Sequence, residues 1–117
     1  MGYTRHHAII VTGMHLDRET EAFSVPESTI LVQDVRDAIL HNIEGLILPV
    51  SEILVSPEEM KGTFLVGPDG SKEGWASSDL GDQQRDLVKR ILLGYRYEDN
   101  SSPVSWAIVQ YLSLIHI

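Results

Sequence analysis

The sequence predicts an α+β domain of the ferredoxin-like, split β-α-β kind, in which two helices cover one face of an antiparallel sheet. Four short segments of strand character and two amphipathic segments follow one another in the order strand, helix, strand, strand, helix, strand. Right-handed crossovers on either side of a hairpin bring this order together as such a sandwich. The two strands that the topology places at the centre, 6–12 and 62–67, are also the most apolar of the four.

The length and composition fit one globular domain. The chain has 117 residues, of which 43% are hydrophobic and 22% are charged. A domain of this size buries roughly 65% of the surface that its unfolded chain exposes, which is enough for a core. We therefore expect residues 1–111 to form a single α+β domain.

The first strand and the first helix are expected at 6–12 and 27–43, with a polar loop at 14–24 between them. Four consecutive apolar residues, Ala8–Val11, are typical of a strand that is buried on both faces. Pro26 suits the first turn of a helix and Gly45 its C-terminal end. The segment 29–32 has strand composition, so a helix that begins only at Asp34 is the alternative. The helical face is formed by Leu31, Val35, Ala38 and Ile39.

A hairpin follows, with strands at 50–55 and 62–67. The segment 46–55 contains Pro49, which suits a strand at the edge of a sheet. The sequence Pro-Asp-Gly-Ser at 68–71 is a strong turn signal.

The clearest helix is predicted at 79–93, and a last strand at 104–111. Ser78 or Asp79 can cap the helix, and Gly94 follows its end. In the last strand, Val104, Trp106 and Ile108 alternate with residues of the other face. The apolar face of the helix comprises Leu80, Gln84, Leu87, Val88, Ile91, Leu92 and Tyr95.

The last six residues, Leu112–Ile117, match the translation of a transposase-type sequencing adapter. We therefore expect residues 112–117 to be a non-native tail on a reading frame that continued past Tyr111. A genuine apolar final strand is the alternative. In either case the segment has strand composition and an apolar edge, which favours pairing between chains.

The charge and the residue types exclude several classes of protein. Nine basic and seventeen acidic residues give a net charge of −8, so nucleic-acid binding through phosphate contacts is not expected. There is no cysteine, hence no disulfide and no thiolate zinc site. The longest apolar stretches are too short to cross a bilayer, and the start lacks the apolar core of a signal peptide. We predict a cytoplasmic protein that does not embed in a membrane.

Arg5, His6 and His7 form a cationic cluster at the start of the first strand. Adjacent strand residues point to opposite faces, so the two histidines do not readily share one metal, and no metal site is expected. A two-histidine phosphoesterase needs two His-x-Thr/Ser motifs. Ala8 and Ile9 follow His7, and a second motif is absent. We predict no catalytic residues and no enzyme.

The segment 68–75 is the other candidate binding element. Its backbone amides and Lys72 can hold a phosphate, and Trp75 can stack on a base. Tyr97, just past the second helix, is expected to line the same region. The alternative is a plain hairpin turn with Trp75 packed against the second helix.

Three patches resemble a group of small phage and prophage proteins: Tyr3–Thr12, Gly67–Trp75 and Tyr97–Asp99. The resemblance implies a phage accessory protein, a class that often counters host defence by binding something. It brings no catalytic residues with it.

Two functional classes follow. The first is a binder of a small phosphate-bearing ligand, such as a nucleotide-type signal of the host, without a cofactor. Its site residues are predicted to be Arg5, His6, His7, Lys72, Trp75 and Tyr97. Because so small a domain has little room inside, this site is expected at a symmetric interface of a homo-oligomer. The alternative is a protein–protein inhibitor whose acidic surface occupies a basic site on a host enzyme.

Overall fold

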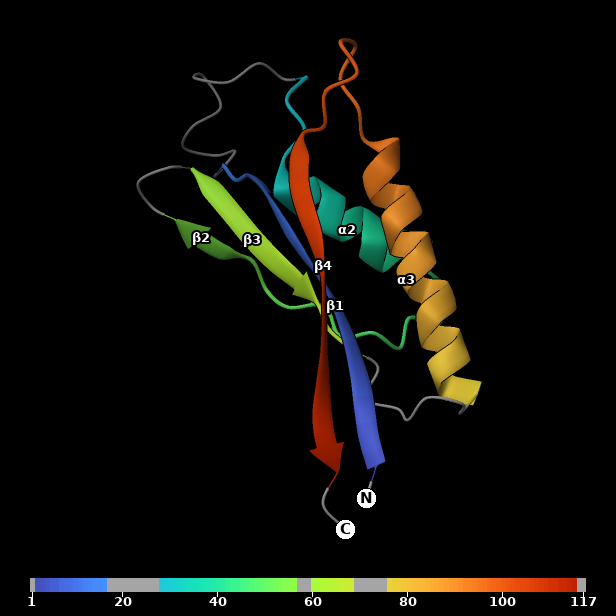
Figure 1. The fold of residues 1–117 in the computed structure, drawn as a ribbon. Coiled ribbons are helices and arrows are strands. Elements are labelled where there is room, and N and C mark those ends of the chain that lie inside the picture. Colours follow the sequence, from blue (N-terminus) through green and yellow to red (C-terminus); the bar gives the residue numbers. More distant parts are fainter. Residues whose placement is uncertain (1, 17–27, 57–59, 69–75, 116–117) are drawn as a thin grey trace.

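The computed structural model describes residues 2–16, 28–56, 60–68 and 76–115, with residues 2–6, 76–78 and 111–115 described by their backbone alone. It is an α+β fold with a four-stranded antiparallel sheet and two helices, in the predicted order (Figure 1). The elements are β1 (Gly2–Met14), α2 (Val32–Asn42), β2 (Leu54–Ser56), β3 (Lys61–Val66), α3 (Ala76–Gly94) and β4 (Val104–Ile115).

The sheet has the strand order β2-β3-β1-β4, so the first and third strands are central, as predicted. Ile9 is opposite Val66 of β3 on one side and opposite Ile108 of β4 on the other. Both central strands contribute fully buried residues, among them Ile9 and Phe64. The most apolar segments thus lie where two neighbouring strands and a helical layer cover them.

β1 and β4 are both longer than predicted, because they continue together past the rest of the sheet. β3 pairs only with Ile9–Met14 of β1, whereas β4 pairs with β1 from Gly13 back to Gly2. The remaining residues form a two-stranded ribbon that extends to Ile115 (Figure 1). The segment 112–115, expected to be a tail, therefore extends the final strand, as its composition allows.

Both helices pack on one face of the sheet and enclose the core. Ile9 and Val11 of β1 face the helices, since side chains alternate along a strand and these two belong to the core cluster. The fully buried sheet residues are Ile9, Val11, Phe64 and Val66, and they meet Val32, Val35 and Ile39 of α2 and Val88 and Leu92 of α3.

A pair of glycines allows the start of α2 to approach the sheet closely. Gly13 and Gly62 are opposite each other in β1 and β3. A Cβ added to Gly62 would lie 3.0 Å from Cγ1 of Val32, and one added to Gly13 would lie 3.3 Å from Cβ of Val32. The added Cβ atoms would lie still closer to other side chains, 2.6 Å from Cγ2 of Ile53 at Gly62 and 2.8 Å from Cγ1 of Val104 at Gly13, so a side chain at either position forces its neighbours to shift.

The first helix is shorter than the predicted 27–43, since residues 28–31 are not helical. Leu31 has extended backbone angles (φ −98°, ψ 151°) and is followed by the first helical residue, Val32. The carboxylate of Asp34 accepts a hydrogen bond from the Leu31 amide at 3.4 Å, which satisfies one donor of the helix start. The strand-like composition of 29–32 therefore delays the helix, close to the alternative start at Asp34.

The second strand is also shorter than 50–55. It spans Leu54–Ser56, and Val50 makes only an isolated bridge to Val66. Pro49 has no amide hydrogen, and the Ser51 hydroxyl accepts the amide of Leu65 at 2.8 Å in place of a backbone carbonyl. A side-chain acceptor thus interrupts the regular ladder. The second helix begins at Ala76, three residues before the predicted 79, and ends at Gly94.

Candidate functional site

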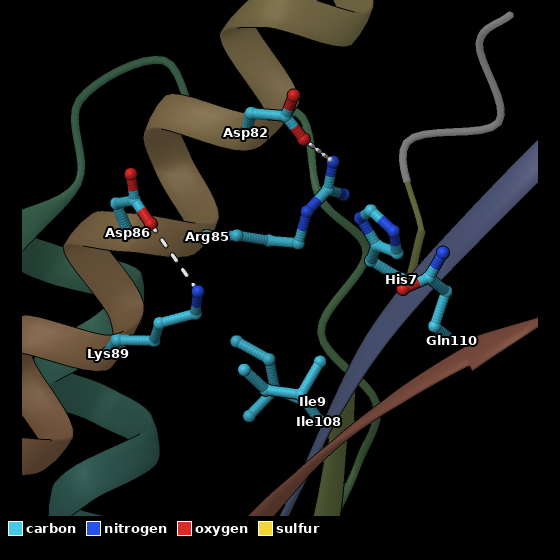
Figure 2. Close-up of a pocket in the computed structure, with 8 residues that line it drawn as sticks. All are labelled: His7, Ile9, Asp82, Arg85, Asp86, Lys89, Ile108 and Gln110. Carbon is cyan, nitrogen blue, oxygen red and sulfur yellow. Dashed lines mark hydrogen bonds and ion pairs between the residues drawn. The ribbon is translucent and has the colours of Figure 1, made fainter. Parts of the chain in front are cut away.

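A hollow of about 430 Å³ lies between α3 and the β1–β4 ribbon (Figure 2). Its volume is within the range of small-molecule pockets. It is lined by Asp82, Arg85, Asp86 and Lys89 of α3, by His7 and Ile9 of β1, and by Ile108 and Gln110 of β4. We call this space the α3–β4 hollow.

The periodicity of each element places these side chains together. The four α3 residues lie at i, i+3, i+4 and i+7, so they share one stripe of the helix beside the buried Val88 and Leu92. On the sheet, His7 is opposite Gln110 and Ile9 is opposite Ile108. The hollow therefore has charged groups along the helix and a floor of strand residues.

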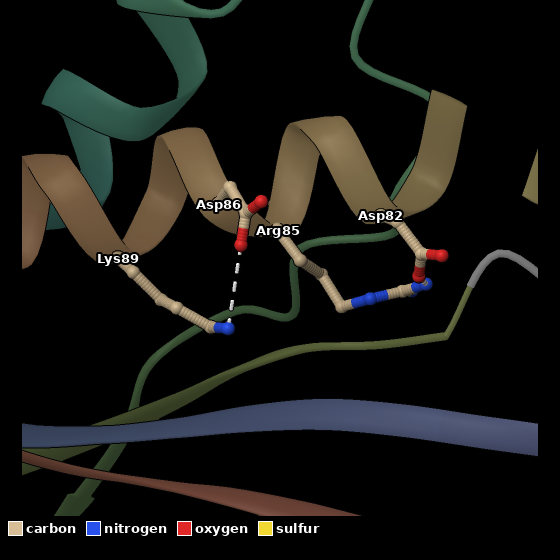
Figure 3. Close-up of polar contacts among 4 residues, drawn as sticks. All are labelled: Asp82, Arg85, Asp86 and Lys89. Atoms are coloured by element: carbon tan, nitrogen blue, oxygen red, sulfur yellow. Dashed lines mark hydrogen bonds and ion pairs between the residues drawn. The ribbon is translucent and has the colours of Figure 1, made fainter. Parts of the chain in front are cut away.

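Arg85 is the unusual residue of this hollow. Its side chain is only 8% exposed, although it is charged. One guanidinium nitrogen, Nη2, donates to Asp82 Oδ1 at 2.6 Å, while Nη1 is buried and has no partner among the described residues (Figure 3). A buried donor without an acceptor is costly, and more so when it belongs to a charged group. Arg85 is thus a pre-positioned donor with spare capacity.

Lys89 and Asp86 form a second, weaker pair on the same stripe. Lys89 Nζ lies 3.4 Å from Asp86 Oδ1, and both side chains are partly exposed. The two cations and two carboxylates of α3 cancel, so the helix side of the hollow has no net formal charge. Such a lining suits a ligand that has both an anionic group and hydrogen-bond donors.

Of the predicted site residues, His7 lines the α3–β4 hollow. Arg5 and His6 precede it on β1, in register with Leu112 and Tyr111 of β4. Lys72 and Trp75 lie outside the described residues.

Tyr97 lies elsewhere. It follows α3, whose 19 residues span roughly 28 Å, whereas Asp82 and Arg85 are in the first half of that helix. The Tyr97 hydroxyl accepts the amide of Ile30 at 3.1 Å, which ties the turn after α3 to the segment before α2. The structure therefore does not bring Tyr97 together with His7.

Tyr97 lines a second hollow, about 550 Å³ in volume, at this end of the molecule, together with Ser28, Ile30, Arg96, Glu98 and Asp99. Hydrogen bonds from the Ser101 hydroxyl (2.6 Å) and amide (3.0 Å) to the Asp99 carboxylate lower the pKa of Asp99. Both bonds are accepted by Asp99 Oδ1, and they stabilise a local turn of the loop itself.

Sequence reasoning missed the four charged residues of α3. It used only the apolar face of this helix. The sequence pattern that could have identified them is the alternation of negative and positive side chains at Asp82, Arg85, Asp86 and Lys89. This pattern is typical of a helix face with ion pairs. The pattern alone does not distinguish a solvated face from one that lies against a sheet.

Comparison of the chain with protein-family models, with curated proteins and with solved structures finds no match. Within the described ranges, neither helix has the length and apolar character needed to cross a membrane. In the same part of the chain, no three histidine or acidic side chains are grouped so as to hold a metal ion.

Proposed function

We propose that this protein is a small, non-catalytic binding protein whose ligand places an anionic group in the α3–β4 hollow. The observation that carries the proposal is Arg85, with one buried guanidinium nitrogen paired to Asp82 and the other without a partner among the described residues. A phosphate or carboxylate oxygen is the acceptor that such a donor prefers.

A nucleotide-type ligand suits the rest of the lining. Its phosphate would meet Arg85 and Lys89, while sugar hydroxyls or base amino groups would donate to Asp82, Asp86 or Gln110. Ile108 offers an apolar surface beside these polar groups. The resemblance to phage accessory proteins extends the proposal to the sequestration of a host nucleotide signal in the cytoplasm.

We also propose that the domain is a variant of the ferredoxin-like arrangement. The element order and the central position of β1 and β3 support this assignment. The three-residue β2 and the long β1–β4 ribbon are departures from a regular example.

The test is an Arg85→Gln variant, compared with Arg90→Gln. Arg90 is an exposed arginine of the same helix that does not line the hollow, so the two variants lose the same charge. A panel of mononucleotides, cyclic mononucleotides and cyclic dinucleotides is incubated with the protein, and mass spectrometry identifies what is retained and whether it is unchanged. Titration calorimetry then gives the affinity of the retained compound.

We expect Arg85→Gln to weaken binding about tenfold or more, because a hydrogen bond to a charged group contributes roughly 1.5–3 kcal/mol. Arg90→Gln should leave the affinity within about twofold, since an exposed charge outside the hollow acts only through solvent. The melting temperature of both variants is measured in parallel. Equal affinity of the two variants for a retained nucleotide would place its site outside the hollow, and retention of a chemically altered nucleotide would show an enzyme.

A further inference from the structure

The edge of the sheet formed by β4 is long and has nothing to block pairing. β4 spans Val104–Ile115 and is the last strand in the order β2-β3-β1-β4, so its outer side has no neighbour in the described part of the chain. Its twelve residues include no charged residue, no proline and no glycine, and this already holds for Val104–Tyr111, the part of β4 that precedes the expected tail. Proteins normally protect an edge strand with such residues, with bulges, or by keeping the strand very short.

The opposite edge is protected in one of these ways. β2 has only three residues, and Pro49 lies five positions before its start. The two edges of the sheet are therefore not equivalent. β4 alone offers a backbone long enough for a stable added strand.

Apolar side chains are exposed on both faces of β4. Ile108 faces the helices and is 46% exposed, although Ile9, opposite it on β1, is fully buried. Val109 faces the other side of the sheet and is 38% exposed. The cover that α3 gives to β1 thus ends before β4, and an added strand would bury apolar area on both faces.

A second copy of this chain satisfies the requirements of that edge. Two β4 strands can pair antiparallel about a two-fold axis, an arrangement in which each strand presents the same surface to the other and the assembly closes. The chain has a net charge of −8, so two copies repel each other overall. β4 against β4 brings none together, because neither strand carries a charge.

We propose that the protein forms a two-fold dimer through its β4 edges. The proposal deepens the proposed function and rests on it in one respect, namely that the α3–β4 hollow is the ligand site. Ile108 and Gln110 of β4 line that hollow. A second β4 beside them would extend the strand floor of each hollow, and we expect that ligand binding and pairing then strengthen each other.

The experiment is sedimentation velocity of the full chain, without any nucleotide, over a range of micromolar concentrations. The variant is Val109→Lys, and the control is Leu65→Lys. Both side chains are 38% exposed and both lie on the face away from the helices, but Leu65 belongs to the inner strand β3. The two variants therefore add the same charge to the same face, once at the β4 edge and once away from it. Circular dichroism checks that both variants fold.

We expect a dimer for the parent chain and for Leu65→Lys, and at least about a tenfold higher dissociation constant for Val109→Lys, because like charges then meet across the two-fold axis. If Val109→Lys leaves the dissociation constant of the dimer unchanged while Leu65→Lys dissociates the dimer, the copies pack face to face and the proposal is wrong. A parent chain that stays monomeric, or that grows into open-ended aggregates, overturns it as well.

The proposed function can fail separately from this inference. Arg85→Gln should leave the dimer without nucleotide unchanged, since Arg85 lies on α3 and not on the edge. A dimer that is weakened by Val109→Lys but retains no nucleotide from the panel would contradict the proposed ligand site and support the β4 interface.

Discussion

Two consecutive polar residues of α3, Gln84 and Arg85, are both buried but differ in how their hydrogen bonds are satisfied. The Gln84 amide donates to Gly45 O at 2.8 Å and accepts from the Ile47 amide at 2.8 Å. Both ends of this side chain are used, and they hold the turn after α2 against α3. Arg85 Nη1 is buried without a partner among the residues that the structure describes. This contrast distinguishes a polar group that holds the fold from one whose hydrogen-bonding capacity the described fold does not use.

The role of Gln84 can be tested with Gln84→Leu, compared with Gln83→Leu. Leucine has a similar size but removes the hydrogen bonds to the Ile47 amide and the Gly45 carbonyl, and each bond contributes about 0.5–1.5 kcal/mol because both of these residues are exposed. Gln83 is exposed, so its replacement should change the free energy of unfolding by less than about 0.5 kcal/mol. Urea unfolding followed by circular dichroism measures both. Equal stability of the two variants would show that solvent replaces the Gln84 bonds without loss.

At the scale of elements, all four strands and both helices were predictable, because hydrophobic periodicity identifies them. The ends of these strands and helices were less predictable. The start of α2 depends on the Asp34 cap, and the length of β2 depends on the Ser51 hydroxyl that replaces a backbone acceptor. The charged stripe of α3 could be read from the sequence, but its position beside the sheet, with Arg85 buried, depends on where the helix crosses the sheet. His7 was predicted for the site, whereas Arg85 became evident only from its burial.

The β1–β4 ribbon allows a prediction about the last residues. Every residue of the core cluster lies between Ile9 and Val104, so removal of residues 112–117 leaves the core complete. The deletion frees Gly2–Arg5 from their partners in β4. We expect a folded chain with a melting temperature lowered by a few degrees at most, about 1 kcal/mol in stability.

The matched comparison is a deletion that begins at Val104 and so removes all of β4, including that core residue. This shorter chain should not fold, since β1 then loses β4, the strand that pairs with it from Gly2 to Gly13. Thermal unfolding and near-ultraviolet circular dichroism compare the two deletions. An unfolded chain after the first deletion would make residues 112–117 an essential part of the sheet.

On the scale of the whole molecule, the strand order places the short, interrupted strand at one edge and the long, uncharged strand at the other. Pattern and topology together predicted which strands are central. They did not reveal the ribbon, because the pairing of 2–5 with 112–115 connects the two ends of the chain and no local periodicity reports it. The β4 edge carries no charged residue, while the chain as a whole has a net charge of −8.

From this distribution of charge we expect the proposed ligand site and the proposed β4 contact to respond to salt in opposite directions. The dimer proposed above brings two chains of charge −8 together through an uncharged contact, so salt should strengthen it by screening their repulsion. Binding of a nucleotide anion to Arg85 and Lys89 should weaken as salt rises, and only moderately, because Arg85 is buried. Between low and physiological ionic strength we expect changes of about two- to fivefold in opposite directions, on the scale of surface charge interactions. Sedimentation velocity without nucleotide and calorimetry with it measure the two effects separately. A dimer that dissociates as salt is added would mean that ion pairs hold the copies together, and an edge without charges would then not be the contact.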